Sequence, residues 1–177
     1  MHPDMPFRHK NIRLHRSNYL GQRSYFVTLC CASRRRVFAN SKNAAWLIEI
    51  LRRQSTAHGF AVRAYCAMPD HFHMLVSGLV PASDLLAYVK NLKLTTSVEY
   101  RARFKKTLWQ KKFYDHILRP KDNAMRIAVY IWMNPVRKGL CEEPEQYPYS
   151  GSFVMDWKKK ASPVEPWTPE WKAKAPA

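Results

Sequence analysis

The chain has 177 residues, 46% of them hydrophobic and 13% aromatic, so it is long and apolar enough to bury one core, and wholesale disorder is excluded. Thirty Lys and Arg against 13 Asp and Glu give a formal net charge of +17. Solubility requires a net charge of only a few units, so this excess predicts a polyanionic partner, and nucleic acid is the usual one.

The first third of the chain predicts a basic arm, a strand and a helix. Residues 1–20 are rich in Arg and His and lack periodicity, which is typical of an arm that orders on a phosphate backbone. Residues 24–32 are dense in β-branched and aromatic residues and predict a buried strand. Ser41 is positioned to cap a helix that runs to about His58, with Gly59 as its stop.

The middle of the chain predicts a hairpin and a second helix. Residues 60–68 and 71–78 are apolar runs separated by a Pro-Asp turn signal. Ser83 is positioned to cap a helix that runs to roughly Arg103.

The last third predicts a short strand at 112–119, a helix from a cap at Asp122 to about Asn134, and a tail. The order strand, helix, strand, strand, helix, strand and added helix is typical of an α+β, ferredoxin-like fold, an antiparallel sheet with helices on one face. We therefore expect three parts: a basic arm over 1–20, a domain over 21–153, and a Pro-, Lys- and Trp-rich tail over 154–177.

The four cysteines form no CxxC pair, so a zinc knuckle has no support. The N-terminal stretch is polar and basic, and no apolar run approaches the length of a membrane span. We expect a cytoplasmic, nucleoid-associated protein with no membrane partner.

Two histidines lie one residue apart in the segment YCAMPDHFHMLV at 65–76. Alternate side chains of a strand share a face, so His71 and His73 point the same way. Two imidazoles on one face are either half of a metal site or partners in ordinary hydrogen bonds. The spacing alone leaves both interpretations open.

The predicted third helix adds Tyr130 and Asn134, which are four residues apart and share a face, with Arg126 one turn earlier. Together with His71 and His73, the Asn134 amide oxygen would hold a divalent ion and leave positions open for phosphate oxygens. A phenol that attacks DNA exchanges one phosphodiester for another, so the break can be resealed without ATP. Taken singly, Tyr130 could instead be a packed aromatic residue and Asn134 a helix end before proline.

Tyr114 and His116 form a second candidate site in the segment FYDHI. Alternation puts both on one face of the fourth strand and Asp115 on the other. We expect Tyr114 to pack and His116 to line the cleft, with Tyr114 kept as the rival nucleophile.

Basic residues are more often a solvated face than specific readers of sequence. In this chain we favour contact with phosphates, without base specificity, while aromatic residues stack on unpaired bases. The candidates are Arg34, Arg35, Arg36, Lys90, Lys93, Lys111, Lys112 and Arg126.

The histidine segment resembles the His-hydrophobic-His signature of single-tyrosine transposases. The segments LWQKKFYDHILR, YIWMNPVRKGL and YPYSGS resemble those of one branch, the REP-associated tyrosine transposases, bacterial proteins that act on repetitive extragenic palindromes. The match spans roughly residues 20–153. It implies a ferredoxin-like fold and cleavage of single-stranded DNA at the foot of a palindrome, with Mg²⁺ or Mn²⁺, leaving a 5′-phosphotyrosine and a free 3′-OH.

Carried over by position, the resemblance makes His71 and His73 the paired metal ligands, Tyr130 the nucleophile and Asn134 the third ligand. The family often carries Asn at the strand turn, where this chain has Asp70, a candidate to hydrogen-bond a liganding histidine. His116 is a second candidate for that supporting role. The family's later Ser-Ser is Ser-Gly-Ser over 150–152 here.

The leading hypothesis is a metal-dependent single-strand endonuclease and strand transferase that acts on hairpin DNA as a monomer or homodimer. One alternative is a palindrome-binding regulator of the same fold that lacks catalysis. Another is a phosphoesterase that hydrolyses with water and leaves no covalent adduct.

Overall fold

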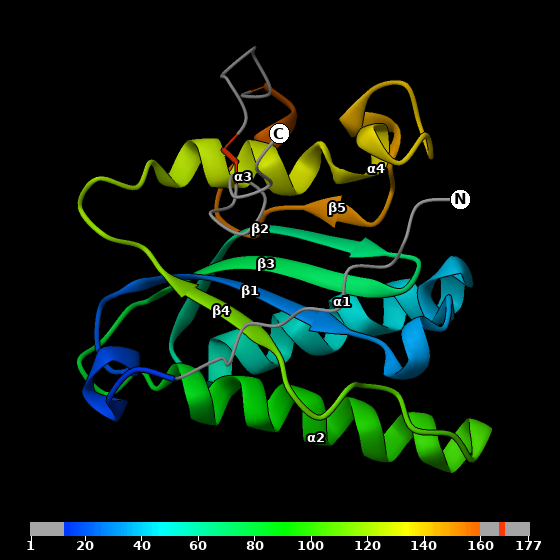
Figure 1. Ribbon diagram of the computed structural model, residues 1–177, viewed down its shortest axis with the longest axis horizontal. Coiled ribbons are helices and arrows are strands. Elements are labelled where there is room, and N and C mark those ends of the chain that lie inside the picture. The colour runs from blue at the N-terminus through cyan, green and yellow to red at the C-terminus, as the bar shows by residue number, and fades with distance from the viewer. Residues whose placement is uncertain (1–12, 160–166, 169–177) are drawn as a thin grey trace, which may run out of the picture.

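Five antiparallel strands form one sheet, in the order β4-β1-β3-β2-β5, in the computed structural model, which describes residues 13–159 and 167–168. Helices α1 and α2 cover one face of the sheet and α3 covers the other (Figure 1). The α+β, ferredoxin-like prediction with an added helix is confirmed. The strands are β1 (Ser24–Cys30), β2 (Phe60–Met68), β3 (His71–Gly78), β4 (Tyr114–Ile117) and β5 (Ser150–Gly151).

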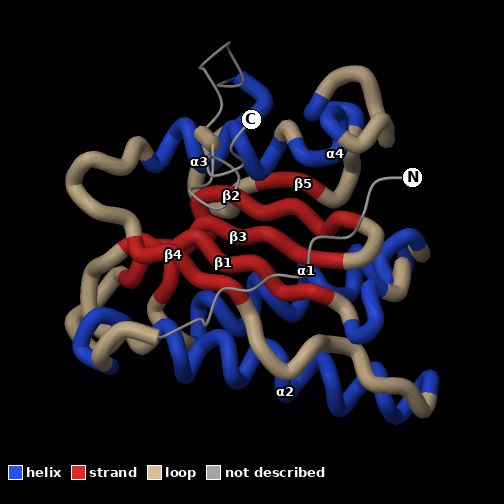
Figure 2. Tube along the Cα trace, viewed as in Figure 1, coloured by secondary structure: helices blue, strands red, loops and turns tan. Residues whose placement is uncertain are grey.

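The helices largely follow the predicted positions, and Figure 2 shows them as two layers with the strands between. None of the helices in the described ranges is long and apolar enough to cross a bilayer. The α-helices are α1 (Ser41–Ala57), α2 (Leu85–Phe104), α3 (Ala124–Trp132) and α4 (Asn134–Arg137), and short 3₁₀ turns occupy Arg16–Tyr19, Ala32–Arg34, Val37–Ala39, Pro144–Gln146 and Trp157–Lys159.

Alternation along β1 divides the core into two clusters. Tyr25, Val27 and Leu29 face α1 and α2, in a cluster that includes Leu47 of α1. Phe26 faces the other way, in a second cluster formed with α3. Because β1 and β3 are neighbours, the alternate residues of β3 divide in the same way, and its histidines lie on the α3 side.

All three predicted helix caps were wrong by one residue. An Asn or Asp directly precedes each helix, and its side-chain oxygen accepts from backbone N–H groups of the first turn, which satisfies donors that the helix leaves unpaired. The caps are Asn40, Asp84 and Asn123, instead of Ser41, Ser83 and Asp122.

Two boundaries in the last third differ from the prediction. The strand predicted over 112–119 is limited to Tyr114–Ile117, and α3 ends at Trp132 instead of near Asn134. The two-residue strand β5 was not predicted, because so short a segment shows no periodicity. Residues 1–12 of the predicted arm and most of the predicted tail lie outside the described residues.

Candidate active site

The paired histidines begin β3 and are buried, with 9% of His71 and 5% of His73 exposed. Their Nε2 atoms lie 3.1 Å apart, and the two rings are nearly perpendicular. The predicted shared face is therefore confirmed, and the two ring nitrogens converge on one point.

The opposite ring nitrogens are held by oxygen atoms. Nδ1 of His71 lies 2.6 Å from Oδ1 of Asp70, and Nδ1 of His73 lies 2.8 Å from Oγ1 of Thr28. This hydrogen bond from His71 lowers the pKa of Asp70 below its ordinary value, and Arg34 holds the other carboxylate oxygen at 3.2 Å. A carboxylate only accepts, so His71 carries its hydrogen on Nδ1, as metal-binding imidazoles with a carboxylate partner do.

This donor set fits a divalent ion of the borderline class. When both Nδ1 atoms donate to their oxygen partners, both Nε2 atoms present lone pairs to the same point. A cation bound at that point would lie between the two nitrogens. No group of three or more His, Cys, Asp or Glu in residues 13–159 and 167–168 is arranged to hold a metal. Among the described residues, an amide oxygen such as that of Asn134 is available as a further ligand, and water or phosphate oxygens could complete the set.

Helix α3 brings Tyr130 to the histidine face of the sheet. The helix begins at the Asn123 cap and is apolar on the side that packs against β2 and β3. Tyr130 is 5% exposed, and its ring centroid lies 6.2 Å from that of His73. Phe26 packs against both rings, at 6.0 Å from Tyr130 and 5.5 Å from His73. The predicted proximity of tyrosine and histidines is thus observed.

Arg137 is a neighbour of Tyr130 that the sequence analysis missed. Its guanidinium carbon lies 4.3 Å from the Tyr130 ring centroid, and one of its nitrogens donates to the Tyr130 carbonyl at 2.8 Å. Burial raises the pKa of Tyr130, and the positive charge and hydrogen bonding of Arg137 act in the opposite direction. Residues seven apart lie two helical turns apart on one face, which is the signal that could have found it.

Asn134 is buried where the helix is interrupted. Pro135 has no N–H to donate to the carbonyl of Ile131, and Nδ2 of Asn134 donates to it instead, at 3.3 Å, as well as to the carbonyl of Tyr130 at 3.0 Å. The amide nitrogen is thereby turned to the helix backbone. The predicted role of the amide oxygen as a metal ligand stays a prediction.

Tyr114 and His116 lie on the same face of β4, as predicted, and Asp115 on the other. Tyr114 packs 6.0 Å from Phe26, and Nε2 of His116 lies 3.0 Å from Oδ2 of Asp122. Trp167 packs between the two candidate sites, with its ring centroid 5.7 Å from that of His116 and 5.4 Å from that of Tyr130. His116 is therefore separated from Tyr130 by one side chain, that of Trp167. Its predicted role of hydrogen-bonding a liganding histidine stays a prediction.

Many of the basic residues predicted to contact DNA lie beside the histidines, because backbone hydrogen bonds connect the segments around 30–36 and 107–112. The Gln110 N–H donates to the carbonyl of Cys30, which pairs with His71 across β1 and β3. Three of these cations hold loops: Arg34 contacts Asp70, Arg35 donates to the Thr107 carbonyl, and Lys93 donates to the Gln110 carbonyl. Exposed are Arg34, Arg36, Lys90, Lys111 and Lys112, while Arg35, Lys93 and Arg126 are half-buried.

Comparison with known proteins decides the family. The family model described as "Transposase IS200 like" matches residues 20–132, which is more than half of the chain. The chain belongs to the IS200-like transposase family. This IS200-like transposase also resembles the REP-associated branch, as its sequence segments predicted.

Two curated relatives carry the name of that branch. A candidate REP-associated tyrosine transposase of Haemophilus influenzae is 31% identical over 120 residues, covering 60% of this chain and 66% of the relative. The REP-associated tyrosine transposase of Escherichia coli is 24% identical over 106 residues, covering 55% of this chain and 62% of the relative. The matches thus span a little under two thirds of each relative.

One solved structure shares the fold over nearly the whole chain. It is a REP-associated tyrosine transposase bound to a REP hairpin, with a TM-score of 0.69 and 20% identity, covering 92% of this chain and 93% of that one.

Changing Asp70 to Asn is expected to weaken Mn²⁺ binding about 10- to 100-fold, because the acceptor of the His71 N–H loses its charge. The measurement is the Mn²⁺ dissociation constant by calorimetric titration. Glu49→Gln is the matched control, since Glu49 is exposed on α1, behind the opposite face of the sheet. Equal affinity in Asp70→Asn and the wild-type protein would show that Asp70 does not support a ligand.

Proposed function

We propose that this IS200-like transposase is a metal-dependent endonuclease and strand transferase that cuts single-stranded DNA at hairpin repeats through a 5′-phosphotyrosine on Tyr130. The observation that carries the proposal is the convergence of the two Nε2 atoms, 3.1 Å apart, on the face of the sheet where the Tyr130 ring packs. The net charge of +17 supports a nucleic-acid substrate, and the REP hairpin bound to the structural neighbour supports this class of DNA.

The proposed reaction exchanges one phosphodiester for another. Tyr130 loses its phenolic proton to solvent, its Oη attacks phosphorus, and the bond from phosphorus to the 3′ oxygen breaks. That oxygen takes up a proton from solvent and leaves as a 3′-OH. Attack by a 3′-OH on the phosphotyrosine reverses the step and rejoins a strand. A bound Mg²⁺ or Mn²⁺ would supply polarisation of the scissile phosphate.

The residues of the chain have separate tasks in this proposal. Thr28 and Asp70 orient His73 and His71, which would hold the ion, with the Asn134 amide oxygen as the third ligand. Arg137 lies over the Tyr130 ring, where its charge favours the phenolate that attacks. The exposed cations beside the histidines (Arg34, Arg36, Lys111 and Lys112) would bind the DNA backbone.

The test is denaturing electrophoresis of end-labelled single-stranded hairpins after incubation with the protein and Mn²⁺. We expect a shifted band of protein-sized mass that carries the label on the 3′ side of the cut, and no such band when EDTA replaces Mn²⁺. Cut DNA without an adduct would indicate the water-dependent phosphoesterase. Hairpin binding with no cutting in Mn²⁺ or Mg²⁺ would indicate the regulator.

A further inference from the structure

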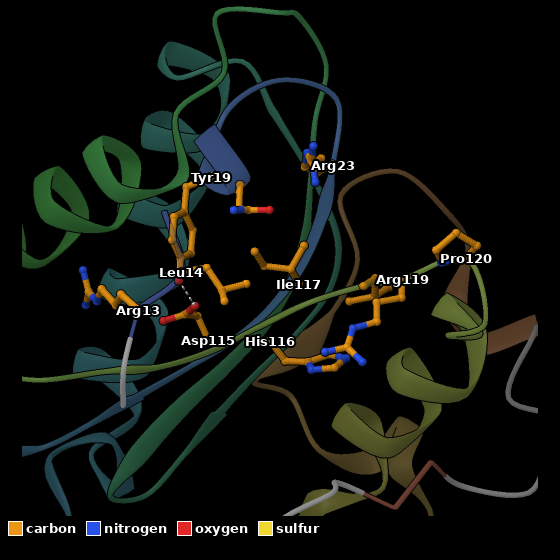
Figure 3. A pocket seen from close by; sticks show the side chains of 11 residues that line it. Arg13, Leu14, Tyr19, Arg23, Asp115, His116, Ile117, Arg119 and Pro120 are labelled. Atoms are coloured by element: carbon orange, nitrogen blue, oxygen red, sulfur yellow. Dashed lines mark hydrogen bonds between the residues drawn. The ribbon is translucent and has the colours of Figure 1, made fainter. Parts of the chain in front are cut away.

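A cavity of about 310 Å³ lies at the β4 edge of the sheet, beside the candidate active site (Figure 3). Its size is at the lower end of small-ligand pockets, large enough for one nucleotide and too small for a duplex. Segments far apart in the sequence meet there: the turn at Arg16–Tyr19 and residues before it, Arg23 directly before β1, and the chain from Asp115 to Pro120.

The cavity has an excess of positive charge. Arg13, Arg23 and Arg119 line it, against one carboxylate, that of Asp115. In the part of the chain that the structure describes, none of these three guanidinium groups forms an ion pair. Three arginines around a cavity of this size would attract the phosphates of a bound strand.

Asp115 is held at one side of the cavity. Its Oδ2 accepts a hydrogen bond from the Tyr19 hydroxyl at 2.9 Å, which Figure 3 shows as a dashed line. Oδ1 accepts no hydrogen bond from the described residues. A carboxylate only accepts, so it favours a ligand that brings a donor. Among the DNA bases, adenine, cytosine and guanine carry an exocyclic amine, and thymine carries none.

The cavity is close to the proposed nucleophile along one route. His116 lines it from the opposite face of β4, and one aromatic side chain, Trp167, lies between His116 and Tyr130, at 5.7 and 5.4 Å between ring centroids. A single strand with its scissile phosphate at Tyr130 would therefore reach the cavity within a few nucleotides.

We propose that this edge cavity binds one unpaired nucleotide of the DNA that flanks the cut, selecting a base with an exocyclic amine. Asp115 accepts from the amine, and Arg23 and Arg119 contact the adjoining phosphates. This inference rests on the proposed function for its DNA ligand, and it adds base selectivity to a chain whose other cations contact only the backbone.

The test measures binding of fluorescent DNA hairpins in EDTA, where nothing is cut, with single-stranded flanks of dC, dA or dT on an identical stem. The wild-type protein is expected to bind the dC and dA flanks about tenfold more tightly than dT. In Asp115→Asn the amide still accepts from Tyr19 but now also donates, so this preference should be lost or reversed. Equal binding of dC and dT flanks by the wild-type protein would overturn the proposal.

Two further comparisons isolate the base contact. A dC flank that carries 2-pyrimidinone, which is cytosine without its amine, should bind as weakly as dT, and this needs no change in the protein. Arg23→Ala and Arg119→Ala should weaken the binding of all flanks equally, and each should reduce the slope of log affinity against log salt concentration by about one. Arg53 is an exposed arginine on α1, and Arg53→Ala should change neither quantity. Unchanged affinity for the 2-pyrimidinone flank contradicts the proposal, while a failure to nick hairpins leaves this base preference standing.

Discussion

Replacing Tyr130 with Phe is expected to abolish the covalent adduct and to lower nicking of single-stranded hairpins by about 10³-fold or more. The substitution removes only the hydroxyl group that forms the bond to phosphorus. The ring contacts with Phe26 and His73 involve no hydroxyl, so the packing of α3 on the sheet is retained. The measurement is adduct formed per minute on denaturing gels, with thermal unfolding recorded for both proteins.

Tyr114→Phe is the matched control for this experiment. Tyr114 is the rival nucleophile, and its ring also packs against Phe26, on the same face of the sheet. We expect Tyr114→Phe to retain nicking within about tenfold of the wild-type rate. An adduct that survives in Tyr130→Phe and disappears in Tyr114→Phe would show that Tyr114, on β4, is the nucleophile. Cutting without any adduct in both variants would point to a water nucleophile.

The antiparallel sheet could be predicted from the order of the elements and the Pro-Asp turn between two strands. The shared face of the histidines could be predicted from strand alternation, a local property of the chain. His71 and His73 differ by two positions, so any strand puts them on one face. The approach of Tyr130 to the histidines could be proposed from the residue types and from the resemblance. Its geometry could not be predicted, because the packing of α3 on β2 and β3 depends on contacts between distant segments.

Features that depend on competition between neighbours were predicted less well. At each helix start two adjacent residues were able to cap, and the sequence does not say which of them turns its side chain to the helix. Asp122, for example, accepts from the Arg119 N–H and pairs with His116, and the cap passes to Asn123. Arg137 was missed for a related reason, since its position over Tyr130 follows from the helical continuation through Pro135.

Changing either His71 or His73 to Gln is expected to reduce Mn²⁺-dependent nicking about 10²-fold or more and to remove one high-affinity Mn²⁺ site from a calorimetric titration. Each change deletes one of the two Nε2 lone pairs that converge at 3.1 Å, and a single imidazole cannot hold the ion with the same geometry. The loss should exceed that of Asp70→Asn, because a ligand is removed instead of the group that orients it.

His58→Gln controls for the loss of a partly buried, hydrogen-bonded imidazole. His58 ends α1 on the opposite side of the sheet, where its ring bonds the Asn91 side chain and packs on Tyr88. We expect His58→Gln to keep both the Mn²⁺ site and nicking, and all three variants to keep the circular dichroism of the wild-type protein. If His71→Gln and His73→Gln bound Mn²⁺ as the wild-type protein does, the two histidines would be partners in an ordinary hydrogen bond, and the ion required for cutting would have to be held elsewhere.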